Sequence, residues 1–173
     1  KMDSTLYDLY DAGSAAWILS DRDLFSYDAN GNMTTYIWYA YDSVKMEILP
    51  YDKETVKYDE AGNVTEVIWF IWDIETGQWV NYGKFDFSYD AQGNMTGQTI
   101  YEWDPVHSQW LEGIRSEMTY DGSGNTLSTL WYSWDEDSAK LALVLKEEYL
   151  YENGQLTTVN EYASEEGVWE LYY

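Results

Sequence analysis

Carboxylates are the most abundant groups in this sequence that could do acid–base chemistry. The chain holds 32 Asp and Glu residues and one His, His107. A glycosidase needs two carboxylates at a set separation in a cleft, whereas four Asp residues here recur as a regular series, which suggests a ladder. These are Asp42, Asp73, Asp104 and Asp135. A catalytic His needs oriented partners, and His107 lies in a predicted loop where none recurs. We therefore predict no enzyme and assign no catalytic residue.

Residues 28–32, Asp-Ala-Asn-Gly-Asn, place oxygen side chains at alternate positions, as calcium-binding loops do. The related segments carry Ala61, Gln92 and Ser123 at the middle position, and no bidentate Glu follows at the required spacing. A Gly that can take positive φ, flanked by Asp and Asn that bond nearby amides, is typical of a tight strand reversal. We therefore predict turns at these segments, with no metal and no cofactor.

Three Trp residues share one position of a sequence repeat: Trp38, Trp69 and Trp131. Along its own segment, Trp38 alternates with residues such as Ile37 and Tyr39. The three Trp residues should therefore lie on the strand face opposite to that of Met33, Ile37 and Tyr39. An exposed row of flat rings beside carboxylates suits sugar rings, which stack on aromatics while their hydroxyls bond to acids. The row is our candidate ligand site. The alternative is that both faces are covered, or that the rings only pack across strands.

All of these motifs recur with one period, and that period organises the chain. Near-copies of Tyr-Asp-x-x-Gly-Asn start at Tyr27, Tyr58, Tyr89 and Tyr120, each 31 residues after the last. We expect a single repeat domain, 1–173, with a truncated copy at 1–26 and a shortened final repeat at 151–173. Self-similarity at such a period is the mark of a repeat architecture.

Residues between the turns alternate with period two, which indicates strands. Each repeat then supplies two strands, giving about twelve strands joined by short loops, so that neighbours run antiparallel. We predict an all-β, antiparallel meander of tandem hairpins in a strongly twisted or coiled sheet. The alternative is a closed up-and-down β-barrel, since large open sheets tend to curl. Pro50, inside a returning strand, should mark a bulge or an edge.

Five of the nine basic residues occupy one repeat position: Arg22, Lys53, Lys84, Arg115 and Lys146. We expect them to form a ladder among carboxylates. The net charge of −23 opposes binding to nucleic acid and to anionic lipid surfaces, and no apolar run is long enough to span a membrane. The absence of Cys excludes thiol chemistry. Truncated repeats should leave sheet edges that allow self-association.

The Tyr-Asp-x-x-Gly-Asn copies resemble the YD repeats of RHS-like bacterial secreted and cell-surface proteins. The resemblance covers nearly the whole chain, although this period is longer than the usual YD unit. It implies an exported protein, located outside the cell or in the bacterial cell envelope, and it transfers no catalytic residue.

The sequence thus predicts an exported, non-catalytic module with a binding or scaffold role. An extended glycan along the Trp38, Trp69 and Trp131 row is the first ligand hypothesis, because equal subsites at equal spacing reward a polymer. The alternatives are protein–protein adhesion and a structural element of a larger surface protein.

Overall fold

The computed structural model describes residues 1–11, 13, 15–165 and 168–171, and in this part of the chain it is all-β. The strands are β1 (Met2–Asp11), β2 (Ala16–Tyr27), β3 (Met33–Asp42), β4 (Glu47–Tyr58), β5 (Val64–Asp73), β6 (Gln78–Tyr89), β7 (Met95–Asp104), β8 (Gln109–Tyr120), β9 (Thr126–Asp135), β10 (Lys140–Glu152), β11 (Gln155–Glu165) and β12 (Val168–Leu171). A search of the described residues finds no helix that could span a membrane.

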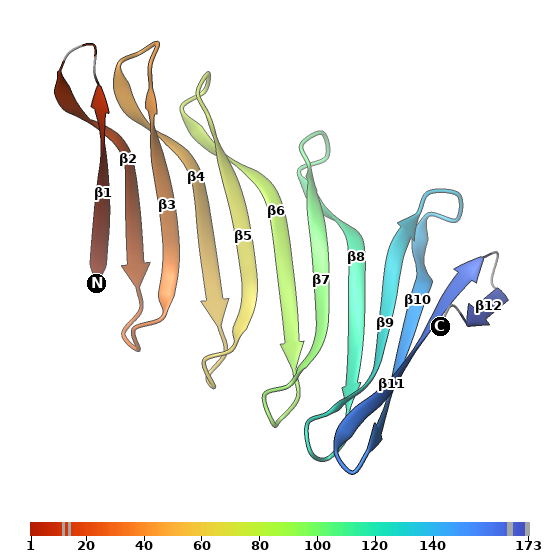
Figure 1. Ribbon diagram of the computed structural model, residues 1–173. Helices are drawn as coiled ribbons and strands as arrows, with labels where there is room; N and C mark the ends of the chain where they lie inside the picture. Colours follow the sequence, from red (N-terminus) through yellow and green to blue (C-terminus); the bar gives the residue numbers. More distant parts are fainter. Residues whose placement is uncertain (12, 14, 166–167, 172–173) are drawn as a thin grey trace. The chain divides into compact units, whose positions relative to one another are not determined.

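The strands follow one another as an antiparallel meander, which confirms the predicted fold class. Hydrogen-bonded order is chain order (Figure 1), with β1 and β12 at its two ends. No pairing joins these two strands in the described residues, so the alternative of a closed barrel is wrong. Contacts divide the chain into two units, 1–83 and 84–173, with the boundary inside β6. Each unit is described by itself below.

The Tyr-Asp-x-x-Gly-Asn segments form one kind of turn, as predicted. In the turn at Asp121, the carboxylate accepts hydrogen bonds from the Ser123 and Asn125 amides at 2.8 and 2.9 Å and from Asn125 Nδ2 at 2.8 Å. Gly124 takes φ +85, which favours glycine. The repeat Tyr secures the same end of the hairpin, since the Tyr120 hydroxyl donates to the Met95 carbonyl at 2.6 Å. The final repeat, 151–173, extends into residues 166–167 and 172–173, which lie outside the described residues.

The Asp residues that suggested a carboxylate ladder end strands and cap the opposite turns. Asp73 Oδ1 accepts from the amides of Glu75 and Thr76, and its Oδ2 accepts from Thr76 Oγ1 at 2.7 Å. The last residue of each such turn has positive φ, but only one of them is glycine. The values are +57° at Met46, +66° at Gly77, +52° at Ser108 and +51° at Ala139.

The positive φ at Ala139 and Gly77 predicts opposite effects on stability for two substitutions in these turns. Ala139→Gly should stabilise the protein by about 0.5–1 kcal/mol, because the left-handed region is strained for a residue with a Cβ. Gly77→Ala should destabilise it by about 1 kcal/mol for the same reason. Urea unfolding measures both. Gly122→Ala is the control, since Gly122 has no positive φ and no atom within 4 Å of an added Cβ, and a loss of stability in Ala139→Gly would contradict the prediction.

Four hairpins of the described structure contain a β-bulge at the same repeat position. The registers skip one residue of the even-numbered strand between paired neighbours; the skipped residues are Ser20, Tyr51, Gly113 and Val144. Pro50, which was predicted to mark a bulge or an edge, lies beside the bulge at Tyr51. A bulge turns an extra side chain toward one face of the sheet, and the Tyr51 side chain is exposed.

Each repeated base lies over an aromatic ring of the next strand, and Lys53 also approaches Trp79 of β6. Lys53 Nζ lies 3.9 Å from the centre of the Phe70 ring and 5.0 Å from that of Trp79. The other bases lie over Tyr39, Tyr101, Tyr132 and Tyr162 at 3.9–5.7 Å. Lys84, Arg115 and Lys146 also contact carboxylates within 4 Å. The expected carboxylate ladder therefore holds at three of five positions in the described structure, while the aromatic contact holds at all five.

Little of this sheet is buried. Of the residues whose burial is described, Val56 is the only buried apolar one, beside the buried polar residues Ser116 and Thr129. The accessible surface is 11733 Å², against about 8,800 Å² for a compact protein of this mass. Stability must therefore come from strand pairing and from contacts between neighbouring side chains on each face, rather than from a closed core.

Candidate functional site

Trp38 and Trp69 lie on the same face of unit 1, on the two sides of β4. Directly paired residues of antiparallel strands share a face. Trp38 of β3 is paired with Asp23 of β2 and Asp52 of β4, and Trp69 of β5 is paired with Glu54 of β4. The predicted alternation holds, because Ile37 pairs with Lys53 on the other face. One face of unit 1 therefore combines indole rings with carboxylates.

The bulge in β4 adds a third ring to this face. The rings of Trp38 and Tyr51 meet edge to face, with their centres 4.7 Å apart. Trp38 is half-buried, whereas Tyr51 is 58% exposed and Trp69 is 38% exposed. A groove of about 500 Å³ lies alongside, lined in part by Pro50, Tyr51 and Ile71. The more accessible rings are therefore those of Tyr51 and Trp69, and Trp38 packs against Tyr51.

The carboxylates of this face are crowded and partly withdrawn from water. Burial raises the pKa of Asp52, and the nearby Asp23 charge raises it further. Asp52 Oδ1 is buried without a hydrogen-bond partner. Burial also raises the pKa of Glu54, with a further contribution from Asp52, and a hydrogen bond from Trp69 partly offsets these effects. Tyr36, whose hydroxyl donates to Asp23 at 2.9 Å, has a raised pKa because of burial and this bond.

Trp131 belongs to unit 2 and has a different environment. It is half-buried, it is paired with Ser116 and Leu145, and its Nε1 donates to Glu147 Oε2 at 3.2 Å. The structure thus brings Trp38 and Trp69 together in unit 1 and places Trp131 in a separate unit. We name the group of Trp38, Tyr51, Asp52, Glu54 and Trp69 the acidic aromatic face.

The sequence analysis missed Tyr51, Asp52 and Glu54 as members of this site. A signal was present, because Tyr51 and Tyr82 occupy the same repeat position and both are exposed. A bulge or an edge was predicted at Pro50. The face of the sheet to which such a bulge turns Tyr51 depends on how β4 is paired with β3. Strand alternation alone does not give that register.

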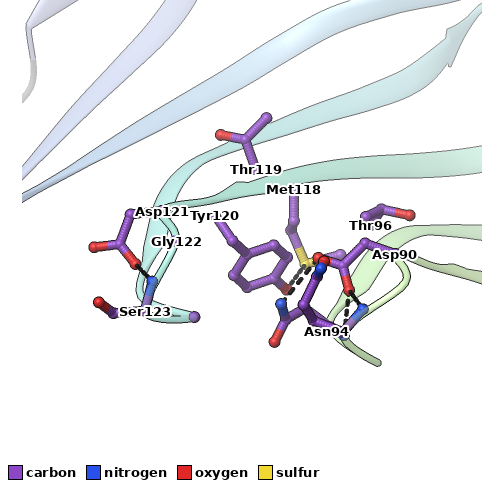
Figure 2. Close-up of a pocket in the computed structure, with 11 residues that line it drawn as sticks. Asp90, Asn94, Thr96, Met118, Thr119, Tyr120, Asp121, Gly122 and Ser123 are labelled. Carbon is purple, nitrogen blue, oxygen red and sulfur yellow. Dashed lines mark hydrogen bonds between the residues drawn. The ribbon is translucent and has the colours of Figure 1, made fainter.

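A second hollow lies in unit 2 between two neighbouring turns, and Figure 2 shows its lining. It measures about 730 Å³ and is bordered by the turns that begin at Asp90 and Asp121, with Met118 and Tyr120 between them. Both carboxylates are engaged inside their own turns, since Asp90 accepts from the Gln92 and Asn94 amides and from Asn94 Nδ2. This hollow follows from the spacing of adjacent turns and offers no free carboxylate to a ligand.

His107 lies in an exposed turn, as the sequence indicated. Its Nδ1 lies 2.6 Å from Asp104 Oδ2, and its amide donates to the same carboxylate. This contact lowers the pKa of Asp104. The side chain therefore caps a turn in the way that Thr76 and Ser138 do in other repeats. The described residues contain no group of three or more His, Cys, Asp and Glu side chains arranged to hold a metal ion.

Comparison with known proteins relates the chain to proteins of unknown function. A model described as "Family of unknown function (DUF3836)" matches residues 69–153. A solved structure of a protein with unknown function from Bacteroides fragilis has 13% identity and a TM-score of 0.56, over 72% of this chain and 88% of that one. A search of the curated proteins finds no match.

Two solved structures of DUF3836 family proteins are also similar. One, from Parabacteroides distasonis, has 16% identity and a TM-score of 0.41, over 64% of this chain and 83% of that one. The other, from Bacteroides vulgatus, has 22% identity and a TM-score of 0.43, over 53% of this chain and 90% of that one.

The expected relation to YD-repeat (RHS-like) proteins is wrong, because the family model that matches is DUF3836. The physical reason is visible in the turns. Tyr-Asp-x-x-Gly-Asn supplies a carboxylate cap, a positive-φ glycine and a hydroxyl for the hairpin end, and any repeated hairpin can use this chemistry. The comparison with the Bacteroides fragilis protein supports the fold alone, at 13% identity.

Proposed function

We propose that this chain is a non-catalytic binding module whose acidic aromatic face holds an extended, neutral glycan. The observation that carries the proposal is the exposure of the Tyr51 and Trp69 rings on one face, with Asp52 and Glu54 beside them. Sugar rings stack their C–H faces on aromatic rings while their hydroxyls donate to carboxylates. This combination on a flat strand surface suits a chain of sugars better than a compact metabolite.

The charge of the face narrows the class of glycan. Burial raises the pKa of Asp52 and Glu54, and the charges of Asp23 on Asp52 and of Asp52 on Glu54 raise these pKa values further, so the three carboxylates lie close together. Anionic polysaccharides would add like charge at this place, at an energetic cost that falls with salt. Neutral glycans carry no such penalty.

Trp69→Ala should weaken glycan binding at least tenfold, which corresponds to about 1.4 kcal/mol. A glycan array identifies the ligand, and titration calorimetry with the best neutral oligosaccharide measures the effect. Trp134→Ala is the matched control, because Trp134 is also an exposed Trp but lies in unit 2; this variant should bind normally. Absence of binding to every glycan, or equal losses in the two variants, would refute the proposal.

Adhesion to a protein is the second candidate function, and the sparse burial favours it. Large apolar side chains such as Tyr51, Ile71 and Tyr82 are exposed within unit 1. Exposed apolar surface of this kind marks interaction sites on many proteins.

A further inference from the structure

The face of unit 1 opposite the acidic aromatic face carries a lysine whose charge no carboxylate balances. Lys53 of β4 is paired with Ile37 of β3 and Phe70 of β5, so these three side chains share a face. Lys53 Nζ lies over the rings of Phe70 and Trp79, and the ion pairs of the described residues do not include it. Burial lowers the pKa of this amine, as it does for a cation withdrawn from water without an opposite charge.

The repeats of unit 2 show which group is missing beside Lys53. There, each base contacts an acid that stands two residues later on the same strand. The pairs are Lys84–Asp86, Arg115–Glu117 and Lys146–Glu148, with shortest N···O distances of 2.6, 3.4 and 2.6 Å. The hydrogen bond to Glu148 raises the pKa of Lys146, whereas the pKa of Lys53 is lowered. The corresponding residue of β4 is Thr55, which carries no charge.

The groups next to Lys53 on this face are hydrogen-bond donors. Thr55 is paired with Thr35 of β3, and both residues are partly exposed. Their hydroxyl hydrogens can turn toward an anion. Lys57 follows on the same face and forms an ion pair with Glu66 at 2.7 Å. The charge that remains unbalanced is therefore that of Lys53, with two hydroxyl groups beside it.

The apolar neighbours of these donors indicate the class of ligand. Ile37 and Ile68 are paired with Lys53 and Thr55, and the Phe70 ring is covered by Lys53 Nζ at 3.9 Å. A sugar stacks on open aromatic rings, and this place offers aliphatic side chains instead. An Asp or Glu side chain flanked by apolar residues can place its carboxylate at Lys53 and its neighbours on the isoleucines.

We propose that Lys53, Thr35 and Thr55 form a carboxylate-binding site for an acidic segment of a partner protein. An Asp or Glu of the partner takes the place that Glu148 takes beside Lys146, and the ammonium and hydroxyl groups donate hydrogen bonds to it. The net charge of −23 repels such a partner at long range. At physiological salt, charges more than about 8 Å apart are largely screened, so the local contacts decide. The site does not depend on glycan binding at the acidic aromatic face.

Thr55→Glu tests the site, because it gives β4 the acid that follows each base in unit 2. The probe is a short labelled peptide of alternating Glu and Val, and a second peptide has Gln in place of Glu. Fluorescence anisotropy at about 0.15 M salt measures the binding of both. We expect the Glu peptide to bind the unchanged chain at least tenfold more tightly than the Gln peptide, and to lose at least tenfold in affinity for Thr55→Glu.

Val44→Glu is the matched control, because it adds the same charge at a turn residue of unit 1 that is 90% exposed. It should bind the Glu peptide normally, and circular dichroism should show that both variants keep the β-sheet signal. Titration of the Lys53 amine by nuclear magnetic resonance gives a second readout on the unchanged chain. Its pKa should rise when the Glu peptide binds, as the contact with Glu148 raises the pKa of Lys146.

Four results would overturn the proposal. They are absence of binding by the Glu peptide, equal binding of the two peptides, unchanged binding in Thr55→Glu, and an unchanged pKa of Lys53 in the complex. An oligogalacturonate is the comparison ligand, since it carries carboxylates on sugar rings. If it binds more tightly than the Glu peptide and loses affinity in Thr55→Glu, the partner is an acidic glycan, and the assignment to a protein segment is wrong.

Discussion

Lys84→Ala is expected to lower the free energy of unfolding by about 2 kcal/mol, the largest loss among the repeated bases. The Lys84 side chain is only 14% exposed, its Nζ lies 2.6 Å from Asp86 Oδ2, and it stands 3.9 Å from the centre of the Tyr101 ring. The substitution removes the packed aliphatic stem, the cation–aromatic contact and the ion pair together. It also leaves the Asp86 carboxylate without its cation, which adds to the loss.

Lys84→Met separates these contributions, since it keeps most of the stem and removes the charge. It should recover about half of the loss, and the remainder should be insensitive to moderate salt because the charge is largely shielded from water. Urea unfolding at two salt concentrations measures both variants. Lys146→Ala is the comparison at a more exposed position, where 38% of the side chain is accessible, and it should cost clearly less. Equal losses at Lys84 and Lys146 would contradict the argument.

The fold could be predicted from the sequence because each local signal agrees with the others. The period of 31 residues, the alternation within each strand and the turn residues all specify antiparallel hairpins. Prediction was less complete for contacts between strands. The bases were recognised as one repeat position, but that they face the rings of Tyr39 and Phe70 depends on the register, which the bulges shift.

The candidate site shows the same limit. The face of Trp38 and Trp69 followed from alternation, and the carboxylates nearby were expected only in general terms. Which residues are exposed was not predictable, because Tyr51 lies in a bulge and covers part of Trp38. Sequence periodicity assigns residues to faces, but accessibility depends on neighbours contributed by other strands.

Stability is expected to rise when the pH is lowered from 7 to about 5 and to fall below about pH 4. Two groups of carboxylates change the stability in opposite directions as the pH falls. Hydrogen bonds within the turns lower the pKa of the turn aspartates, which are Asp28, Asp42, Asp59, Asp73, Asp90, Asp104, Asp121 and Asp135. Their contribution is complete above the pKa of an unfolded Asp, about 3.9. It is lost as the pH falls through their lower folded values.

Asp52 and Glu54 have the opposite effect on stability, because burial raises the pKa of each. The folded chain takes up protons at these residues before the unfolded chain does, so that stability increases as the pH falls from neutrality toward about 4. Lowering the pH also reduces the repulsion within a chain of net charge −23. Thermal unfolding followed by circular dichroism at pH 7, 5 and 3 should therefore give its highest midpoint at pH 5.

Glu54→Gln distinguishes the buried carboxylates from general repulsion. High salt screens exposed charges, so in high salt the remaining rise between pH 7 and 5 should depend on Asp52 and Glu54 and should shrink in this variant. Glu60→Gln, at an exposed turn position, is the matched control and should keep the full rise. A midpoint that falls steadily from pH 7 to 3 would show that the turn aspartates dominate throughout. An unchanged rise in Glu54→Gln would remove the acidic aromatic face as its source.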